Sequence, residues 1–207
     1  MIKEKTKHIR YLQAFLAVIA LALFGWCLYV KDFELLFFIK DHIRNDLFDV
    51  IVPFYTNLGN DGIIWIVFGA VLLIPKKTRK CGIMVLGALL VMLVVNNIIL
   101  KNLIARERPC ATYPELVELV KIPTSFSFPS GHTVSAMAVG FTVFTQHKKL
   151  GTVTLILAFL MGLSRLYVGV HFPTDVYGGI FVGAAIAFAV YYLEKKITPI
   201  VLKILKK

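Results

Sequence analysis

The stretch SRLYVGVHFPTD, residues 164–175, joins two long apolar segments of the chain. It places Arg165, His171 and Asp175 around one short bend. Ionisable side chains are costly inside a bilayer, so those found among spanning segments usually serve a function. We therefore expect a membrane protein with functional side chains at a bend between two spanning helices.

The rest of the chain has the composition of a membrane protein. Hydrophobic residues make up 58% of the 207 positions, whereas a soluble domain has about 45–50%. A spanning helix needs about 20 apolar residues, and the second segment must recruit Thr56–Asp61 to reach that length. We expect an all-α, six-span transmembrane bundle that forms a single domain, 1–207. The six apolar segments are Tyr11–Val30, Gly62–Ile74, Cys81–Leu100, Gly131–Gln146, Gly151–Val168 and Val176–Leu193.

The distribution of charge predicts the orientation. Residues 3–10, 76–80, 148–149 and 195–207 carry 15 of the 23 Lys and Arg residues, and all fall on one side of a six-span model. Positively charged loops stay in the cytoplasm, so both termini should be cytoplasmic and the protein a multi-pass protein of the plasma membrane. The net charge of +11 is then a topology signal, and we expect no nucleic-acid partner.

Phe33–Tyr55 has a different pattern. Apolar residues recur there at helical spacing, and charged residues fill the other face. This predicts an amphipathic helix on the outer interface of the bundle. Two roles are open for it, a lid over the bundle or a gate for a lipid. In the last segment, Gly179 and Gly183 are spaced for close helix packing.

Two further clusters accompany the opening stretch. Lys101 is followed by Arg108-Pro109, and Pro129-Ser130-Gly131-His132 opens the fourth segment. In the six-span model all three clusters lie on the outer side. Together they resemble the signature of the type 2 phosphatidic acid phosphatase family, integral-membrane lipid phosphatases, and every motif position is present.

The residue types suit phosphoryl transfer. Arg108 and Arg165 can donate paired hydrogen bonds to a phosphate, and Lys101 adds a point charge. Ser130 is a candidate N-cap, Gly131 allows close approach of the backbone, and the first turn of a helix binds anions. Phosphoryl transfer asks mainly for positioning and charge stabilisation. No cluster has the pattern of a metal site, and we expect no metal or other cofactor.

The resemblance implies individual roles. His171 would attack phosphorus and form a phosphohistidine, and Asp175 would orient it. His132 would protonate the leaving oxygen and then activate water. The phosphoryl oxygens would be held by Lys101, Arg108, Arg165, Ser130 and Gly131.

The function expected from this resemblance is hydrolysis of a phosphate or diphosphate ester on a membrane lipid, at the outer leaflet. On family grounds undecaprenyl diphosphate is the favoured substrate. Phosphatidylglycerophosphate or phosphatidic acid is the alternative. A transporter or a non-catalytic scaffold remains open, although a transporter would carry its charges near the membrane midplane. The sequence does not indicate an oligomeric state.

Overall fold

The computed structural model describes residues 2–116 and 118–205, with side chains at residue 13 and over 16–116 and 118–198. All regular structure in these ranges is helical, as expected for the all-α class. The elements in chain order are α1 (Ile2–Phe38), the π-helical turn η1 (Ile39–Ile43), α2 (Asp46–Leu58), the 3₁₀ turn η2 (Asn60–Gly62), α3 (Ile63–Leu73), α4 (Arg79–Met92), the π-helical η3 (Leu93–Leu100), α5 (Lys101–Ile104), α6 (Pro109–Thr112), α7 (Gly131–Gln146), α8 (Lys148–Tyr167) and α9 (Pro173–Leu205).

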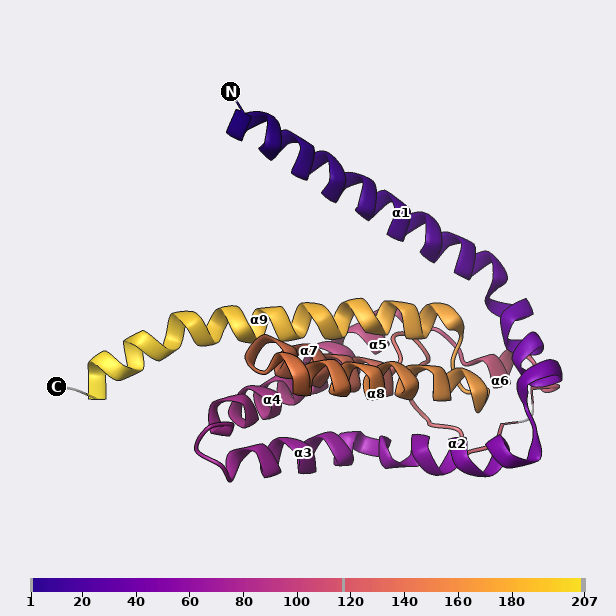
Figure 1. Ribbon diagram of the computed structural model, residues 1–207. Coiled ribbons are helices and arrows are strands. Elements are labelled where there is room, and N and C mark those ends of the chain that lie inside the picture. The colour runs from indigo at the N-terminus through magenta and orange to yellow at the C-terminus, as the bar shows by residue number, and fades with distance from the viewer. Residues whose placement is uncertain (1, 117, 206–207) are drawn as a thin grey trace.

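Helix α7 forms the centre of the bundle and packs against α4, α8 and α9 (Figure 1). Small residues allow these helices to approach closely. A Cβ atom added at Gly179 would lie 2.9 Å from Thr133 Cβ, and one at Gly183 would lie 2.9 Å from the carbonyl oxygen of Val134. The predicted packing role of Gly179 and Gly183 is thus confirmed, and it brings the start of α9 against the start of α7.

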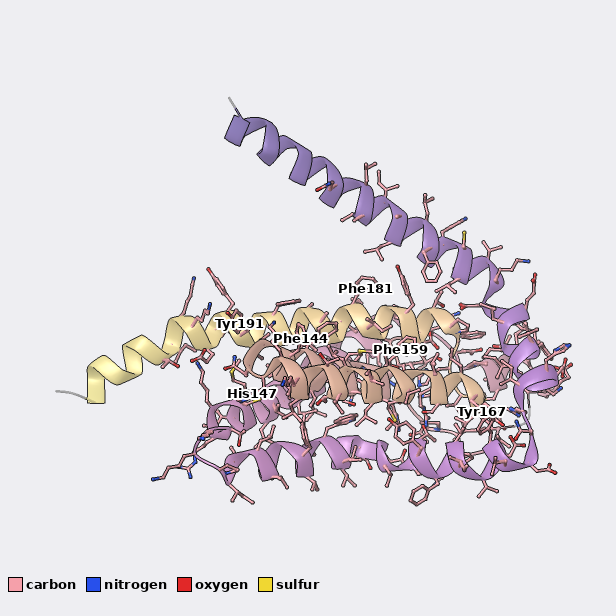
Figure 2. The ribbon with its side chains drawn as sticks, viewed as in Figure 1. Phe144, His147, Phe159, Tyr167, Phe181 and Tyr191 are labelled. Carbon is pink, nitrogen blue, oxygen red and sulfur yellow. The ribbon has the colours of Figure 1, made fainter. Side chains whose placement is uncertain are left out.

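The two ends of the bundle differ in chemistry. The α3–α4 and α7–α8 turns lie at the same end as both termini, whereas the α8–α9 turn lies at the other (Figure 1). His147 and Tyr167, at opposite ends of α8, mark the two in Figure 2. At the first end, Lys80 Nζ lies 2.8 Å from Glu194 Oε1. The basic segments at 76–80 and 148–149 therefore share one end, away from the three motifs.

The apolar surface agrees with a membrane location. Large apolar side chains are exposed along α1, α3 and α8, and Phe159 and Phe181 point outward from the bundle (Figure 2). A soluble monomer rarely exposes apolar patches of this extent. Within the described residues, four helices are long and apolar enough to cross a bilayer, and the bent pair α2–α3 would make a fifth. Helix α7, at 16 residues, falls short of this length, so six spans remain a prediction.

The second span is broken as well as short. Helices α2 and α3 are bent by 46° at η2. Asp61 and Gly62 have φ values of 52° and 71° there, in the left-handed region that glycine tolerates best. The expected recruitment of Thr56–Asp61 is therefore only partly helical. Thr56 continues α2, while Asn60 and Asp61 form the bend and turn polar groups toward the site end.

The prediction of one amphipathic helix over Phe33–Tyr55 is wrong. The segment is divided between the end of α1, the turn η1 and most of α2. Arg44 is extended, and the Asn45 side chain accepts a hydrogen bond of 3.1 Å from the backbone N–H of Phe48. Asparagine is among the best N-cap residues, so it begins a new helix where the apolar spacing alone suggested continuity.

Helix α1 attaches to the bundle near its C-terminal end and diverges from α9 toward its N-terminus (Figure 1). Among its described side chains only Asp32 and Leu36 are buried. Farther back, the Tyr177 hydroxyl donates a 2.6 Å hydrogen bond to the carbonyl oxygen of Leu21. A carboxylate is thus one of the two α1 side chains that the bundle encloses.

Candidate active site

The three motifs meet at one end of the bundle. Lys101 begins α5, Arg108 precedes α6, and His132 lies in the first turn of α7. Arg165 lies in the last turn of α8, and Asp175 in the first turn of α9. His171 lies in the turn between α8 and α9, so contributions from six parts of the chain converge.

A cavity of about 870 Å³ opens at this point. Of the eight predicted site residues, five line it and three do not. Ser130, Arg165 and Asp175 lie outside its lining, and all three are buried. The five that line it are Lys101, Arg108, Gly131, His132 and His171.

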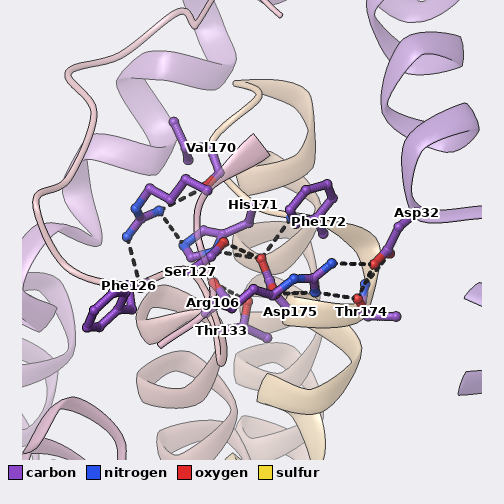
Figure 3. Close-up of polar contacts among 12 residues, drawn as sticks. Asp32, Arg106, Phe126, Ser127, Thr133, Val170, His171, Phe172, Thr174 and Asp175 are labelled. Carbon is purple, nitrogen blue, oxygen red and sulfur yellow. Dashed lines mark hydrogen bonds and ion pairs between the residues drawn. The ribbon is translucent and has the colours of Figure 1, made fainter. Parts of the chain in front are cut away.

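The imidazole of His171 is held from its Nδ1 side (Figure 3). Nδ1 lies 3.3 Å from Asp175 Oδ2 and 3.3 Å from Ser127 Oγ. Ser127 donates its own proton to Asp175 Oδ2 over 2.5 Å, so its oxygen is left as an acceptor toward the ring. An ionised carboxylate also only accepts. Both neighbours therefore require a proton on Nδ1, which leaves Nε2 unprotonated.

The two oxygens of Asp175 both accept hydrogen bonds. Its Oδ1 accepts a 2.7 Å bond from Arg106 Nη1. Its Oδ2 accepts a 2.9 Å bond from the backbone N–H of Phe172 in addition to the Ser127 bond. Charge-assisted bonds of this kind favour the carboxylate over the acid.

Arg108 approaches His171 from the Nε2 side. Its Nη1 lies 3.2 Å from Nε2 and donates a 2.8 Å bond to the carbonyl oxygen of Val170. The Nε atom donates over 2.8 Å to the carbonyl oxygen of Ser125. Lys101 Nζ donates to Ser125 Oγ and to the carbonyl oxygen of Phe126, over 2.9 Å and 2.7 Å. The two cations thus meet the segment at Ser125–Phe126 beside the Nε2 lone pair.

The pKa of His171 is lowered well below its ordinary value of 6.5, first by burial and then by the positive charges of Arg108 and Arg165. Burial disfavours the charged imidazolium, and nearby cations repel it. The ring is consequently neutral at physiological pH, as an attacking imidazole must be.

Arg165 has a different place from the one expected. It is fully buried, its Nη1 donates a 2.7 Å bond to Thr56 Oγ1, and its Nε has no hydrogen-bond partner in the described part of the chain. Its positive charge acts on His171, whose pKa it helps to lower. Its anchor, Thr56, comes from α2.

His132 is held by the bend in the second span. Its Nε2 lies 3.1 Å from Asn60 Oδ1, in η2. A Cβ atom added at Gly59 would come within 2.7 Å of His132 Cδ2 and 2.8 Å of Met161 Sδ. Glycine at position 59 therefore allows the bend to close against the histidine.

The PSGH segment departs in one respect from expectation. Ser130 occupies the N-cap position of α7, but its side chain makes no capping hydrogen bond. Instead Ser130 Oγ accepts a 3.1 Å bond from Thr133 Oγ1, and its backbone N–H donates to the carbonyl oxygen of Asp175 over 3.1 Å. Gly131 faces the cavity, and a Cβ atom there would stand 3.7 Å from Asn97 Oδ1 and 4.0 Å from Lys101 Cε.

Several site residues escaped the sequence analysis. Ser127, Asn60 and Arg106 each contact a predicted residue. Asp32 interacts with Arg106 from α1. An acid at the end of a long apolar segment was the available signal for Asp32. Within the described residues no group of three or more His, Cys, Asp or Glu side chains could hold a metal ion.

A known protein family matches the part of the chain that carries the three motifs. The family model described as "PAP2 superfamily" matches residues 81–199, which is more than half of the chain. The chain belongs to the PAP2 superfamily. It is a membrane-embedded lipid phosphatase, as the sequence signature predicted.

Three relatives show the breadth of this superfamily. The chain is 32% identical to the bacitracin transport permease protein BcrC of Bacillus licheniformis, over 74% of this chain and 78% of the relative. It is 35% identical to the undecaprenyl-diphosphatase of Sulfolobus acidocaldarius, over 63% of this chain and 64% of the relative. The crystal structure of the PAP2-type phosphatidylglycerolphosphate phosphatase from Bacillus subtilis superimposes with a TM-score of 0.67 at 29% identity, covering 86% of this chain and 96% of that one.

Proposed function

We propose that this PAP2 phosphatase hydrolyses a lipid diphosphate at the outer leaflet, with undecaprenyl diphosphate as its substrate. The observation that carries the proposal is the cavity, which is lined by both charged and apolar side chains. Lys101, Arg108, His132 and His171 line it together with apolar side chains of α3 and α4. A ligand with a charged head and a long apolar tail fits such a lining. The apolar lining residues are Ile66, Leu86, Leu89, Leu90, Met92 and Leu93.

The reaction begins with His171. Its Nε2 lone pair attacks the terminal phosphorus, and the bond from phosphorus to the leaving oxygen breaks as the N–P bond forms. His132 gives its proton to the leaving oxygen, so the lipid monophosphate departs. Lys101 and Arg108, which line the cavity, balance the charge on the phosphoryl oxygens. The buried guanidinium of Arg165 adds a third positive charge nearby.

Water completes the cycle. Neutral His132 takes a proton from a water molecule whose oxygen attacks the phosphohistidine. The N–P bond breaks, inorganic phosphate leaves, and His171 recovers its lone pair while Asp175 keeps the proton on Nδ1. Neither step requires a metal ion.

The names of the relatives support the choice of lipid. One is named an undecaprenyl-diphosphatase, while the structural neighbour is named a phosphatidylglycerolphosphate phosphatase. Phosphatidylglycerophosphate, or phosphatidic acid, is accordingly the alternative substrate. A transporter is less well supported, because Arg106, Arg108 and Asp175 contact one another or His171 around the α8–α9 turn rather than midway along the spans.

The test is phosphate release by the purified protein in detergent containing EDTA. Undecaprenyl diphosphate, phosphatidylglycerophosphate and phosphatidic acid are compared at equal concentrations. We expect the highest kcat/KM for the first, and inhibition by vanadate. His171→Ala should abolish turnover, and His132→Ala should reduce it by about 10²–10⁴-fold, the usual worth of general acid–base assistance. Near-normal phosphate release by folded His171→Ala protein would refute the mechanism.

A further inference from the structure

Asp32 is the starting point of the inference. It is only 4% exposed, although most of the described α1 side chains around it face outward. A buried carboxylate is costly unless its oxygens are paired. Hydrogen bonds must therefore offset the cost of burying Asp32, because α1 otherwise contacts the bundle little.

Three donors satisfy Asp32, and all come from the site end (Figure 3). Arg106 Nη2 donates to Oδ2 over 2.8 Å. The backbone N–H of Thr174 donates to Oδ1 over 2.9 Å, and the Thr174 hydroxyl donates to Oδ2. Thr174 is the residue immediately before Asp175, so Asp32 holds the first turn of α9 directly.

Arg106 links Asp32 to the catalytic carboxylate. While its Nη2 bonds Asp32, its Nη1 donates over 2.7 Å both to Asp175 Oδ1 and to Thr174 Oγ1. The guanidinium carbon also lies 4.0 Å from the ring centroid of Phe172. A planar guanidinium held at two edges and one face has a fixed orientation.

This fixed guanidinium determines the rotation of the Asp175 carboxylate. Arg106 supplies the hydrogen bond that Oδ1 accepts in the described part of the chain, while Oδ2 meets Ser127, Phe172 N–H and His171. If Arg106 lost its anchor on Asp32, the carboxylate would lose its restraint on the Oδ1 side. Oδ2 already lies 3.3 Å from His171 Nδ1, so a small rotation would weaken that contact.

We propose that Asp32 and Arg106 are positioning residues of the phosphatase, which extend the His171–Asp175 pair into a four-residue chain reaching α1. The proposal rests on the proposed function. It also states that α1 is part of the active site, although the family model begins only at residue 81.

If Asp32 and Arg106 only stabilised the packing of α1 against α9, their loss would have a different effect. It would lower stability and leave turnover per folded molecule unchanged. Loss of a positioning residue lowers kcat while leaving KM nearly constant, because neither Asp32 nor Arg106 lines the cavity that takes the substrate.

The test compares Asp32→Asn, Arg106→Gln and the double variant with the wild type. Asp32→Asn keeps the size and an acceptor for Thr174 but removes the charge. We expect a fall in kcat of about 10-fold or more, with KM changed less than twofold, and partial recovery in Asp32→Glu. If Asp32 acts through Arg106, adding Asp32→Asn to Arg106→Gln should reduce kcat no further.

Glu34→Gln is the matched control, since Glu34 lies on the exposed side of the same helix and pairs only with Lys31 among the described residues. It should retain wild-type kcat. Thermal unfolding is measured for each variant, and kcat is expressed per folded molecule. Wild-type kcat in Asp32→Asn, or an additive loss in the double variant, overturns this inference alone. An inactive wild type on all three lipids overturns the proposed function and this inference with it.

Discussion

At the scale of single residues, the site separates groups that face the ligand from groups that act through others. Lys101, Arg108, His132 and His171 line the cavity, whereas Arg165 and Asp175 stand behind it. The distinction matters for pH dependence. A charged residue that does not line the cavity, such as Arg165, can shift the pKa of His171 without changing the groups that line the cavity.

Arg165 supplies the first residue-scale prediction. Together with burial and Arg108, it lowers the pKa of His171. Removing this positive charge in Arg165→Gln makes protonation of the ring easier and raises that pKa. Protonated His171 cannot attack, so activity in the variant should be lost at a higher pH as the medium is acidified. The acidic limb of the kcat/KM profile reports this change in the free enzyme. An acidic limb at the same pH as in the wild type would contradict the prediction.

Lys121 supplies the second prediction at the scale of single residues. It lines the same cavity from the loop before the PSGH motif, and it is exposed. An exposed ammonium attracts an anionic headgroup but is screened by salt. Lys121→Ala should raise KM about two- to fivefold at low salt with little change in kcat, and the difference should shrink in about 0.5 M NaCl. Steady-state kinetics at two salt concentrations measure it. A fall in kcat at constant KM would assign Lys121 another role.

The residues that could be predicted are those carried by local motifs. His171 and Asp175 are four apart, and Asp175 in the first turn of α9 reaches back to the residues just before the helix, so a short local segment brings the two together. Asp32 and Thr174 are 142 residues apart, and Asn60 and His132 are 72 apart. No local spacing encodes such contacts, because they depend on how whole helices pack. The contact between Arg165 and Thr56, which are 109 residues apart, has the same origin.

At the scale of secondary-structure elements, the bend between α2 and α3 is the feature that shapes the site. It was visible in the sequence only as a span that was too short. The expected helix over Phe33–Tyr55 is divided because Asn45 caps α2, whereas the apolar periodicity continues across the break and does not show it. Capping residues therefore located this boundary better than periodicity did.

The bend yields a prediction at position 59. Gly59→Ala would place a Cβ atom 2.7 Å from His132 Cδ2, so the histidine or the bend must move. We expect kcat to fall about 10-fold or more, since small displacements of catalytic groups are costly. Gly87→Ala on α4 is the control, because a Cβ atom there meets no neighbour within 4 Å. Equal kcat in the two variants would show that the bend does not position His132.

At the scale of the whole molecule, sidedness is the property that connects structure to physiology. The basic segments and the motifs lie at opposite ends of the bundle. We infer that the basic end is cytoplasmic and that α7, although short, completes a six-span count. The site then faces the outside, where a spent lipid carrier would be dephosphorylated.

Cysteine labelling tests this orientation. In a background without Cys27, Cys81 and Cys110, a Glu115→Cys variant should react with a membrane-impermeant thiol reagent on intact cells. A Lys77→Cys variant should react only after lysis. Both positions are exposed, so a difference in reactivity reports sidedness rather than burial. The reverse pattern would overturn the topology.

The pairing of Asp32 also constrains how the protein is made. Translation delivers α1 to the membrane first, while Arg106 and Thr174 follow 74 and 142 residues later. At typical ribosome speeds the interval before Thr174 emerges is on the order of ten seconds. Until then the carboxylate must stay hydrated at the membrane surface or pick up a proton, since the bilayer offers it no partner. The Asp32 pairing is therefore completed only when α9 inserts and meets α1.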